Sequence, residues 1–339
     1  MAFNVTLQPS GLQFVADEDS TLLDAAEKAG VAMPYGCRGG SCGACKGRVV
    51  EGDLERGIED RFALTEAERA DGYMLLCVAH PKSDVIVEVA DVGRMGEIVV
   101  KTMPTRIDAI ERAAPDVVVV TLKLPATENF EFRAGQYITL MFKDGERRDF
   151  SIANAPHERQ HVQLHIRLSE GSYSTRMFTE VLKEKDILRF EGPLGNFHLN
   201  PASGKPMILV AAGTGFAPIK AILDDMAHKH IERDVHLYRG SRDRAGLYLP
   251  DLPAQWEKTI PNFTHVPVLS DATSACTWSG RSGLVHQAVM EDFADLSPYE
   301  VYACGAVAMV EAARRDFITH GLAPEAFFAD TFTPAPTKN

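Results

Sequence analysis

Residues 36–45 read Gly-Cys-Arg-Gly-Gly-Ser-Cys-Gly-Ala-Cys, and a further cysteine stands alone at position 77. The three cysteines of this stretch are separated by four and then two residues, and 31 residues lie before the fourth. Thiolates in this spacing are typical ligands of a [2Fe–2S] cluster. Structural zinc is the alternative, but zinc sites usually take cysteines in two close pairs or combine them with histidines. We therefore predict that Cys37, Cys42, Cys45 and Cys77 bind an iron–sulfur cluster and that the protein moves single electrons.

The residues around this loop predict a small strand-rich domain. Glycines at positions 36, 39, 40 and 43 let the backbone wrap a bulky group and bring amides close to its sulfurs. A short helix is expected between Ser20 and Gly30, because Ser20 or Thr21 can cap its start and Gly30 can end it. Alternating apolar residues predict strands at 3–7, 12–15 and 85–89. We expect this first domain to span residues 1–92.

The chain of 339 residues is too long for that domain alone, and its length suggests two or three domains. No apolar run approaches 18 residues, and the start lacks a basic region followed by a hydrophobic one, so we expect no membrane span and no signal peptide. Four of the six cysteines belong to the predicted cluster, which leaves Cys276 and Cys304. So few cysteines do not make a disulfide scaffold, and we expect a cytoplasmic protein.

The net charge of −12 is concentrated near the N-terminus. Residues 1–92 hold 16 Asp and Glu against 8 Lys and Arg, a net charge of −8. This acidity argues against nucleic-acid binding. It favours either steering toward a basic partner surface or solubility alone. Because Arg38, Lys46 and Arg48 stand beside the cluster cysteines, we expect the face around the cluster to be less acidic than the rest of the domain.

The middle of the chain predicts an antiparallel barrel over residues 101–200, joined to the first domain by a linker that starts near residue 92. Strand-like runs at 105–110, 117–124, 137–142, 162–168 and 187–191 are separated by Pro, Gly and Asn turns. A helix is expected at 176–182 and a closing turn at 192–195.

Two patches of this barrel suggest a flat, phosphorylated cofactor. One is Arg148-Asp149-Phe150-Ser151, and the other is Glu170-Gly171-Ser172-Tyr173-Ser174-Thr175, before the expected helix. Alone, the first is a solvated charge at a strand end and the second a helix cap. Together they supply an arginine for a pyrophosphate, hydroxyls and amides at a helix start, and an aromatic ring for stacking.

The last third, residues 204–339, predicts a doubly wound parallel sheet. The apolar run 206–212 reads as a buried strand, and Gly213-Thr214-Gly215-Phe216-Ala217-Pro218 leads into an amphipathic helix at 219–228. Strand, glycine-rich turn and helix make a phosphate-binding unit, although the pattern G-x-G-x-x-P departs from the usual dinucleotide fingerprint. Further strands are expected at 235–238, 263–268 and 300–304.

Taken in this order, the three units resemble NAD(P)H-dependent reductases with an N-terminal plant-type ferredoxin domain (a β-grasp fold), a flavin-binding barrel like that of ferredoxin-NADP reductase, and a C-terminal nicotinamide-nucleotide domain. The resemblance covers essentially the whole chain. It is closest to reductase components of ring-hydroxylating dioxygenases and multicomponent monooxygenases, and especially to CDP-6-deoxyhexulose-3-dehydrase reductases. The stretches that carry this last likeness are FNVTLQPSG at 3–11, PYGC at 34–37 and WSGR at 278–281.

The resemblance implies FAD, because the ferredoxin-first order goes with FAD in this family and FMN relatives place the ferredoxin last. Arg148, Phe150 and Ser151 match the family's R-x-Y-S motif. It implies that Arg148 faces the flavin phosphates and that Ser151 bonds near flavin N5, whereas Phe150 keeps the stacking of the usual Tyr without its hydroxyl. The matches to the family's pyrophosphate segment are Gly171, Ser174 and Thr175.

For the nicotinamide nucleotide, the resemblance implies contacts from two segments. Gly213, Thr214, Gly215 and Pro218 match the family's nucleotide loop, and Cys304 and Gly305 match its Cys-Gly pair beside the nicotinamide. For Cys304, a small buried strand residue is the alternative. Ser241 and Arg242 end the second strand, where the adenosine ribose would lie, and we expect NADH there, with NADPH possible. Phe332 either covers a flavin face or packs in the core.

The function that these inferences predict is a reductase relay. Electrons would pass from NAD(P)H through FAD and the [2Fe–2S] cluster to a partner oxygenase or dehydrase, with Ser151 and Cys304 shaping the site of hydride transfer. A carrier that has lost nucleotide binding and a redox-sensing protein are the alternatives. The intact loop at 213–218 argues against the first, and the second lacks any DNA-binding motif or additional domain.

Overall fold

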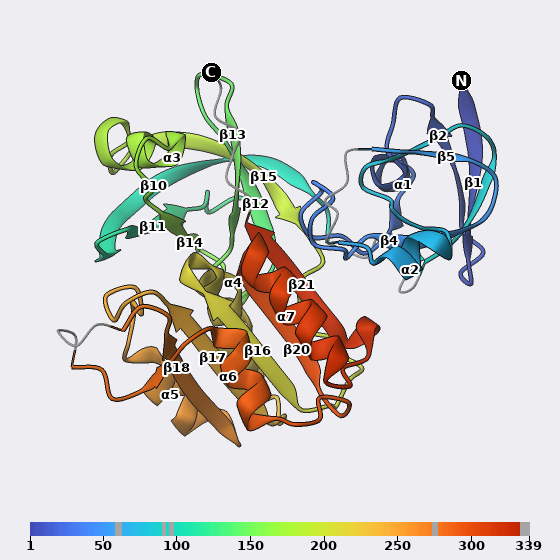
Figure 1. Ribbon diagram of the computed structural model, residues 1–339. Helices are drawn as coiled ribbons and strands as arrows, with labels where there is room; N and C mark the ends of the chain where they lie inside the picture. The colour runs from blue at the N-terminus through green and yellow to red at the C-terminus, as the bar shows by residue number, and fades with distance from the viewer. Residues whose placement is uncertain (58–62, 90–92, 95–97, 273–276, 333–339) are drawn as a thin grey trace. The chain divides into compact units, whose positions relative to one another are not determined.

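The computed structural model describes residues 1–57, 63–89, 93–94, 98–272 and 277–332. These residues form two compact units, one of residues 1–99 with residues 329–331, and one of the other described residues from 100 onward (Figure 1). Cys276, which the sequence leaves outside the cluster, lies outside the described residues.

The first unit is built on a mixed five-stranded sheet of order β2-β1-β8-β4-β6. Its strands are β1 (Ala2–Gln8), β2 (Gln13–Asp17), β4 (Lys46–Glu51), β6 (Tyr73–Leu75) and β8 (Val85–Glu88). β1 runs antiparallel to β2 and parallel to β8. Short strands pair separately, β3 (Val31–Ala32) with β9 (Gly93–Arg94) and β5 (Leu54–Arg56) with β7 (Ala79–Pro81). The three strands predicted here are confirmed to within about two residues at each end.

Helix α1 (Leu22–Lys28) forms where the sequence predicts it. Thr21, not Ser20, is the cap, and its hydroxyl accepts a hydrogen bond from the Asp24 amide at 3.1 Å. Gly30 follows the helix with a positive φ of 72°, which suits glycine. A second short helix, α2 (Glu66–Ala70), starts with a capping box between Thr65 and Glu68. The expected linker is wrong at its start, because residues 93–94 pair with β3 as a strand.

The second unit begins with an antiparallel sheet of order β13-β12-β15-β10-β11-β14. Its strands are β10 (Lys101–Ala114), β11 (Val117–Lys123), β12 (Tyr137–Met141), β13 (Arg147–Ser151), β14 (His161–Arg167) and β15 (Ile187–Leu194). A bridge between Ile152 and Leu164 joins the two edge strands, so the sheet closes into the predicted barrel. Its apolar core includes Ile107, Val120, Leu140 and Phe190, all fully buried.

Three details of the barrel differ from the prediction. β13 is a strand where no strand was expected, because it forms a hairpin with β12. Residues 192–194, expected in a turn, extend β15 through pairing with β10 and β12. The helix starts at Tyr173 as α3 (Tyr173–Arg176), because the Ser172 hydroxyl accepts from the Thr175 amide, and it continues as a π-helical turn, η1 (Met177–Val181).

The C-terminal part of the second unit is the doubly wound sheet that the sequence predicts, of order β19-β18-β17-β16-β20-β21. The pairs that join β16 through β20 are all parallel. The strands are β16 (Met207–Ala212), β17 (Val235–Ser241), β18 (Phe263–Leu269), β19 (Arg281–Ser282), β20 (Glu300–Ala306) and β21 (Phe327–Phe332). The sheet is therefore an open one, and ligands of such sheets bind outside the carboxyl ends of the strands.

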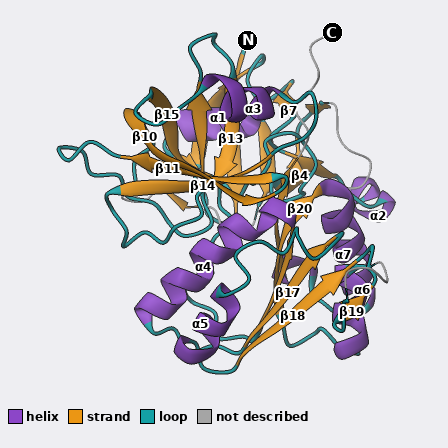
Figure 2. Cartoon of the chain, turned by 90° about the vertical axis from the view of Figure 1, so that its left-hand side faces the viewer, coloured by secondary structure: helices purple, strands orange, loops and turns teal. Residues whose placement is uncertain are grey.

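Helices cover both faces of this sheet (Figure 2), with α4 (Phe216–Lys229) and α5 (Leu252–Thr259) on one side and α6 (Val285–Asp292) and α7 (Val307–Thr319) on the other. Two short 3-10 turns, η2 (Gly213–Gly215) and η4 (Pro324–Ala326), precede α4 and β21. α4 starts three residues earlier than predicted, with Pro218 in its first turn. No helix among the described residues is long and apolar enough to cross a membrane.

A buried ion pair joins β20 to the segment before β17. The Arg233 guanidinium lies 2.8 Å from the Glu300 carboxylate, and the two side chains are 5% and 6% exposed. Arg233 also donates to the Lys205 carbonyl at 2.7 Å, and the Tyr302 hydroxyl donates to Glu300 at 3.2 Å. Each charge is thus paired and hydrogen-bonded, as a buried charge must be.

We predict that Glu300→Leu destabilises the second unit by about 3–5 kcal/mol, because it leaves the Arg233 charge buried without a partner. The double variant Arg233→Met/Glu300→Leu should recover much of that loss. Both tryptophans, Trp256 and Trp278, lie in residues 204–339, so urea unfolding followed by tryptophan fluorescence reports on this region.

The control is Glu88→Gln, which breaks the exposed pair of Arg48 with Glu88 in the first unit and should leave this transition unchanged. Equal stability of Glu300→Leu and the unmodified protein would contradict the assigned role of the pair.

Candidate functional site

The four predicted cluster cysteines come from two segments of the first unit. Cys37, Cys42 and Cys45 stand in the loop before β4, and Cys77 follows β6, which pairs with β4. All four are free thiols, with Cys37 partly exposed and the other three buried. The pairing of β4 with β6 thus explains how the isolated cysteine reaches the loop.

The sulfurs approach one another in two pairs. The thiols of Cys37 and Cys42 are close enough to shift each other's pKa, and the same holds for Cys45 and Cys77. The Cys37 sulfur also accepts from the amides of Ser41 and Cys42, both at 3.3 Å. The neighbouring Cys42 thiol and those amides lower the pKa of Cys37 to about 4, which favours its thiolate.

This arrangement fits a two-iron cluster better than a single metal ion. Two sulfur pairs match two irons with two thiolates each, and the amides that point at Cys37 supply the hydrogen bonds that tune such clusters. The donor set therefore fits a [2Fe–2S] group.

The loop is held in an unusual backbone conformation. Gly40 and Gly43 have positive φ angles of 76° and 71°, as predicted from the glycines of this loop. Arg38 also has a positive φ, of 54°, in the left-handed region that favours glycine. Arg38 stays there because its guanidinium lies 4.5 Å from the Tyr35 ring centroid and bonds Asp24 and Glu27 of α1. Helix α1 therefore anchors the cluster loop.

The three basic residues beside the cluster do not act as free positive charges. Arg38 pairs with Asp24 and Glu27, while Lys46 and Arg48 pair with the carboxylates of Glu68 and Glu88. Each of these cations is therefore matched by an acid, and a less acidic face around the cluster stays a prediction.

In the second unit, the two patches of the predicted flavin site lie together. Arg148, Phe150 and Ser151 lie on β13, and Ser172 and Thr175 lie at the start of α3. The Arg148 guanidinium lies 5.0 Å from the centroid of the Tyr173 ring on that helix. Phe150 packs edge-on against Phe178 at 6.1 Å, and Ser151 is 7% exposed.

These residues fit a phosphorylated flavin by their chemistry. Thr175 donates to the Ser169 carbonyl at 2.7 Å, so its hydroxyl is already oriented, and open space surrounds Gly171, which has a φ of 71°. The Arg148 guanidinium forms an ion pair with the Glu146 carboxylate at 2.7 Å. A bound pyrophosphate would replace that carboxylate as the partner of Arg148. Glu146 was missed from the sequence, whereas Ser172 was named there within the second patch. The interpretation of that patch as a helix cap is confirmed, because the Ser172 hydroxyl accepts from the Thr175 amide.

The predicted nucleotide loop and the Cys-Gly pair are in direct contact. A Cβ built on Gly215 would lie 2.1 Å from the carbonyl oxygen of Cys304 and 2.7 Å from the amide nitrogen of Gly305. A Cβ on Gly213 would lie 2.5 Å from the Arg167 guanidinium at the end of β14. At Gly215 the clash is with backbone, so only glycine fits there; at Gly213 the arginine side chain can shift, and the positive φ of 56° is what favours glycine. Thr214 and Cys304 are buried, 7% and 0% exposed.

The remaining predicted residues occupy the carboxyl edge of the sheet or its core. Ser241 ends β17 and Arg242 is exposed directly after it, where the carboxyl ends of parallel strands meet. Phe332 ends β21 and packs on the apolar core of the parallel sheet, so core packing accounts for its position and a flavin contact stays a prediction.

The WSGR stretch proves to be structural. The Trp278 indole donates to the Arg281 carbonyl at 2.7 Å, and Arg281 bonds the Ala288 carbonyl and the Asp292 carboxylate of α6.

Three family models match the chain in sequence order. They are a 2Fe-2S iron-sulfur cluster binding domain at residues 5–82, an oxidoreductase FAD-binding domain at 104–199 and an oxidoreductase NAD-binding domain at 209–315. The chain is 42% identical over 336 residues to the CDP-6-deoxy-L-threo-D-glycero-4-hexulose-3-dehydrase reductase of Yersinia pseudotuberculosis, covering 99% of this chain and 100% of that protein. The chain belongs to the family of ferredoxin-containing flavin reductases.

Other members of this ferredoxin-containing flavin reductase family match over the same length. The reductase component 1 of terephthalate 1,2-dioxygenase from Comamonas sp is 35% identical over 340 residues, which cover 99% of each chain. Among solved structures, the Amycolatopsis cytochrome P450 reductase GcoB superposes with a TM-score of 0.78 at 34% identity, covering 98% of this chain and 99% of that one. The predicted fold class and the cofactors [2Fe–2S], FAD and NAD(P)H are confirmed, and the chain is a flavoprotein oxidoreductase.

We predict that Gly215→Ala abolishes NADH-dependent turnover, because the new methyl group would push the nucleotide loop away from the Cys304–Gly305 backbone. Flavin content should persist, since the patches on β13 and α3 are untouched. The measurements are steady-state reduction of an artificial acceptor and the absorption spectrum of the purified variant.

Gly204→Ala is the matched control, because no atom lies within 4 Å of its added Cβ. Full turnover of Gly215→Ala with an unchanged KM for NADH would show that the nucleotide does not use this loop.

Proposed function

We propose that the protein is the reductase component of a multicomponent system and takes electrons from NADH to a separate acceptor protein through its two resident groups. When bound, FAD accepts a hydride and returns electrons singly, and the [2Fe–2S] cluster passes on one electron at a time. The observation that carries the proposal is the contact of Gly215 with the Cys304–Gly305 backbone, which joins the predicted nucleotide loop to the predicted nicotinamide pair.

The chain's residues would divide the work as follows. Arg148 and the capped start of α3, with Gly171, Ser174 and Thr175, would hold the flavin phosphates. Phe150 would stack on the ring system, and the buried Ser151 hydroxyl would orient near its reactive edge. The loop of Gly213, Thr214, Gly215 and Pro218 would hold the nucleotide diphosphate, and Cys304 and Gly305 would border the nicotinamide. Ser151 and Cys304 are the two residues proposed at the reacting atoms.

We assign NADH as the donor on the chemistry after β17. Arg242 and Asp243 follow Ser241 on the exposed turn, and the Asp243 carboxylate accepts from the Gly246 amide at 3.0 Å. A fixed carboxylate at a ribose site accepts from a 2′-hydroxyl and repels a 2′-phosphate. The cytoplasm is the proposed location, since five free thiols among the described residues suit a reducing compartment.

For the acceptor, we propose a dehydrase component of the kind named for the Yersinia relative. Identity to that reductase is 42%, against 35% to the terephthalate dioxygenase reductase, at the same coverage of this chain. The cluster loop, with Cys37 partly exposed, is the proposed point of exit for the electrons.

An anaerobic NADH titration tests the relay. We expect the flavin and cluster absorption to bleach together and a rhombic [2Fe–2S] signal to develop in low-temperature electron paramagnetic resonance. NADPH should reduce the protein more slowly, and the flavin released by heat should have the mass of FAD.

Cys77→Ser is the companion variant, in which the flavin should still bleach without the normal cluster signal. Bleaching of the flavin alone in the unmodified protein would overturn the relay.

The acceptor proposal is tested by NADH oxidation in the presence of purified partner components. The dehydrase component with its substrate should raise the rate about tenfold more than a Rieske oxygenase component does, because only the matched surface brings the cluster close enough. Cytochrome c reduction is the control that the relay itself works. Faster turnover with the oxygenase would reassign the acceptor and leave the relay intact.

A further inference from the structure

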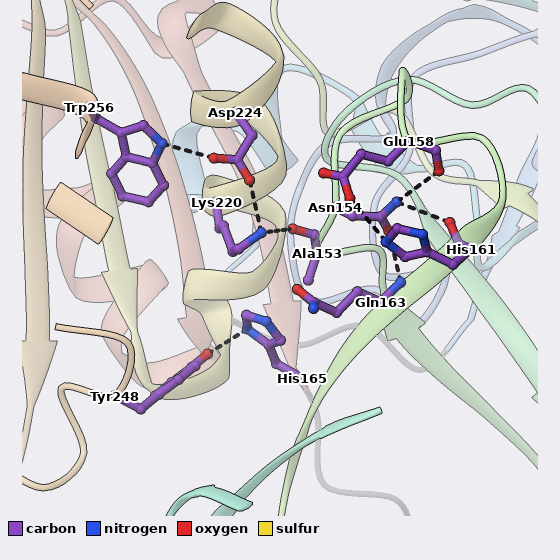
Figure 3. A network of polar contacts seen from close by, with 10 residues as sticks. All are labelled: Ala153, Asn154, Glu158, His161, Gln163, His165, Lys220, Asp224, Tyr248 and Trp256. Atoms are coloured by element: carbon purple, nitrogen blue, oxygen red, sulfur yellow. Dashed lines mark hydrogen bonds and ion pairs between the residues drawn. The ribbon is translucent and has the colours of Figure 1, made fainter. Parts of the chain in front are cut away.

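A lysine of helix α4 reaches from the nucleotide sheet to the flavin barrel (Figure 3). The Lys220 ammonium donates to the backbone carbonyl of Ala153 at 3.1 Å and lies 2.8 Å from the Asp224 carboxylate. Its side chain is only 11% exposed. Ala153 comes two residues after Ser151, and Lys220 comes five residues after Gly215. The contact therefore connects the two segments that would hold hydride acceptor and hydride donor.

The hydrogen-bond donor, Lys220, is held firmly by its neighbours. Asp224 uses one carboxylate oxygen for Lys220 and the other for the Trp256 indole N–H at 2.8 Å. Trp256 is 3% exposed and packs against Phe216, the first residue of α4. Asp224 thus holds the Lys220 ammonium in place, and Asp224 is itself held by Trp256 of the apolar core. A nearly buried cation needs such a partner.

The hydrogen-bond acceptor, the Ala153 carbonyl, is equally constrained. The Ala153 amide donates to the Gln163 carbonyl at 2.7 Å, and Ala153 is fully buried. The Asn154 side chain accepts from the Gln163 amide at 2.8 Å and donates to the His161 carbonyl at 3.0 Å. The Ala153 carbonyl is therefore a fixed point at the end of β13.

A neutral contact crosses the same junction. His165 on β14 and the Tyr248 hydroxyl, in the segment after β17, lie 2.9 Å apart. Burial, with the charge of Lys220 second, lowers the pKa of His165 to about 3, so this imidazole is neutral near pH 7. The hydrogen bond between Lys220 and Ala153 is therefore the charge-assisted contact of the two, and such bonds are the stronger kind.

We propose that Lys220 is a positioning residue that sets the distance between the flavin-binding end of β13 and the nucleotide loop before α4. The ammonium pins the Ala153 carbonyl to the start of the helix, so that nicotinamide and flavin meet at a fixed separation. Donor and acceptor must approach to about 3–3.5 Å for such a transfer, and a displacement near 1 Å costs about 100-fold in rate. The inference rests on the proposed hydride site.

The experiment compares Lys220→Met with Lys229→Met in the FAD-loaded protein. Lys229 lies on the same helix and forms an (i, i+4) pair with Asp225 at 2.7 Å, but it is more exposed and reaches no barrel residue that the structure records. We expect Lys220→Met to lower the limiting rate of flavin reduction by NADH at least about tenfold in stopped-flow measurements. The NADH dissociation constant should change less than about threefold, because the loop that binds the nucleotide is intact.

Hydrogen exchange supplies a readout independent of activity. Peptides that cover residues 151–163 and 213–224 should exchange faster in Lys220→Met and not in Lys229→Met, in protein with and without bound nucleotide. A limiting rate within about twofold of the unmodified protein overturns the proposal, as does a loss confined to the dissociation constant.

If Lys220→Met does not retain FAD, the test uses Asp224→Asn. This variant keeps the lysine and removes the carboxylate charge that orients its ammonium. A reduction rate at least about threefold lower supports the role, and an unchanged rate overturns it. If the NADH titration succeeds and Lys220→Met does not change the rate of flavin reduction, only this inference is rejected. If the titration fails in the unmodified protein, the proposed function on which the inference rests is rejected.

Discussion

The close approach of Gly215 to the end of β20 is the constraint on which the second unit's site depends. Parallel pairing of β16 with β20 sets Ala211 beside Cys304, so the loop after one strand must cross the end of the other. There is room for that crossing only because residue 215 has no side chain. Once the loop is placed, α4 follows in a fixed direction, and Lys220, Asp224 and the core residue Phe216 take their positions from it.

Much of this could be predicted because the signals are local. Each of these signals is formed by residues close to one another in the sequence. Examples are the spacing of Cys37, Cys42 and Cys45, the apolar run before Gly213, and the cap and stop of α1. Short-range chemistry decides such features, and the structure agrees with them. The glycines of the loop were predicted for phosphate contact, and the structure adds a second reason in the backbone of β20.

What the sequence did not reveal depends on contacts between distant residues. β13 is a strand because β12 pairs with it, and residues 192–194 stay extended because β10 and β12 flank them. Nothing near Lys220 in the sequence indicates that it bonds a carbonyl 67 residues away. The start of α3 was a different failure, since the segment around Ser172 was recognised as a possible cap but the helix was still expected to begin at residue 176 and not at Tyr173.

The separation of the fourth cysteine from the other three has a consequence for folding. A cluster held by Cys45 and Cys77 would be a covalent bridge across the chain, next to the pairing of β4 with β6, and it would remove conformations from the unfolded state as a disulfide does. For a loop of this length the chain-entropy model gives about 3–4 kcal/mol. Chain without the cluster would lack this restraint, so the stability of the first unit would depend on whether the cluster has been assembled.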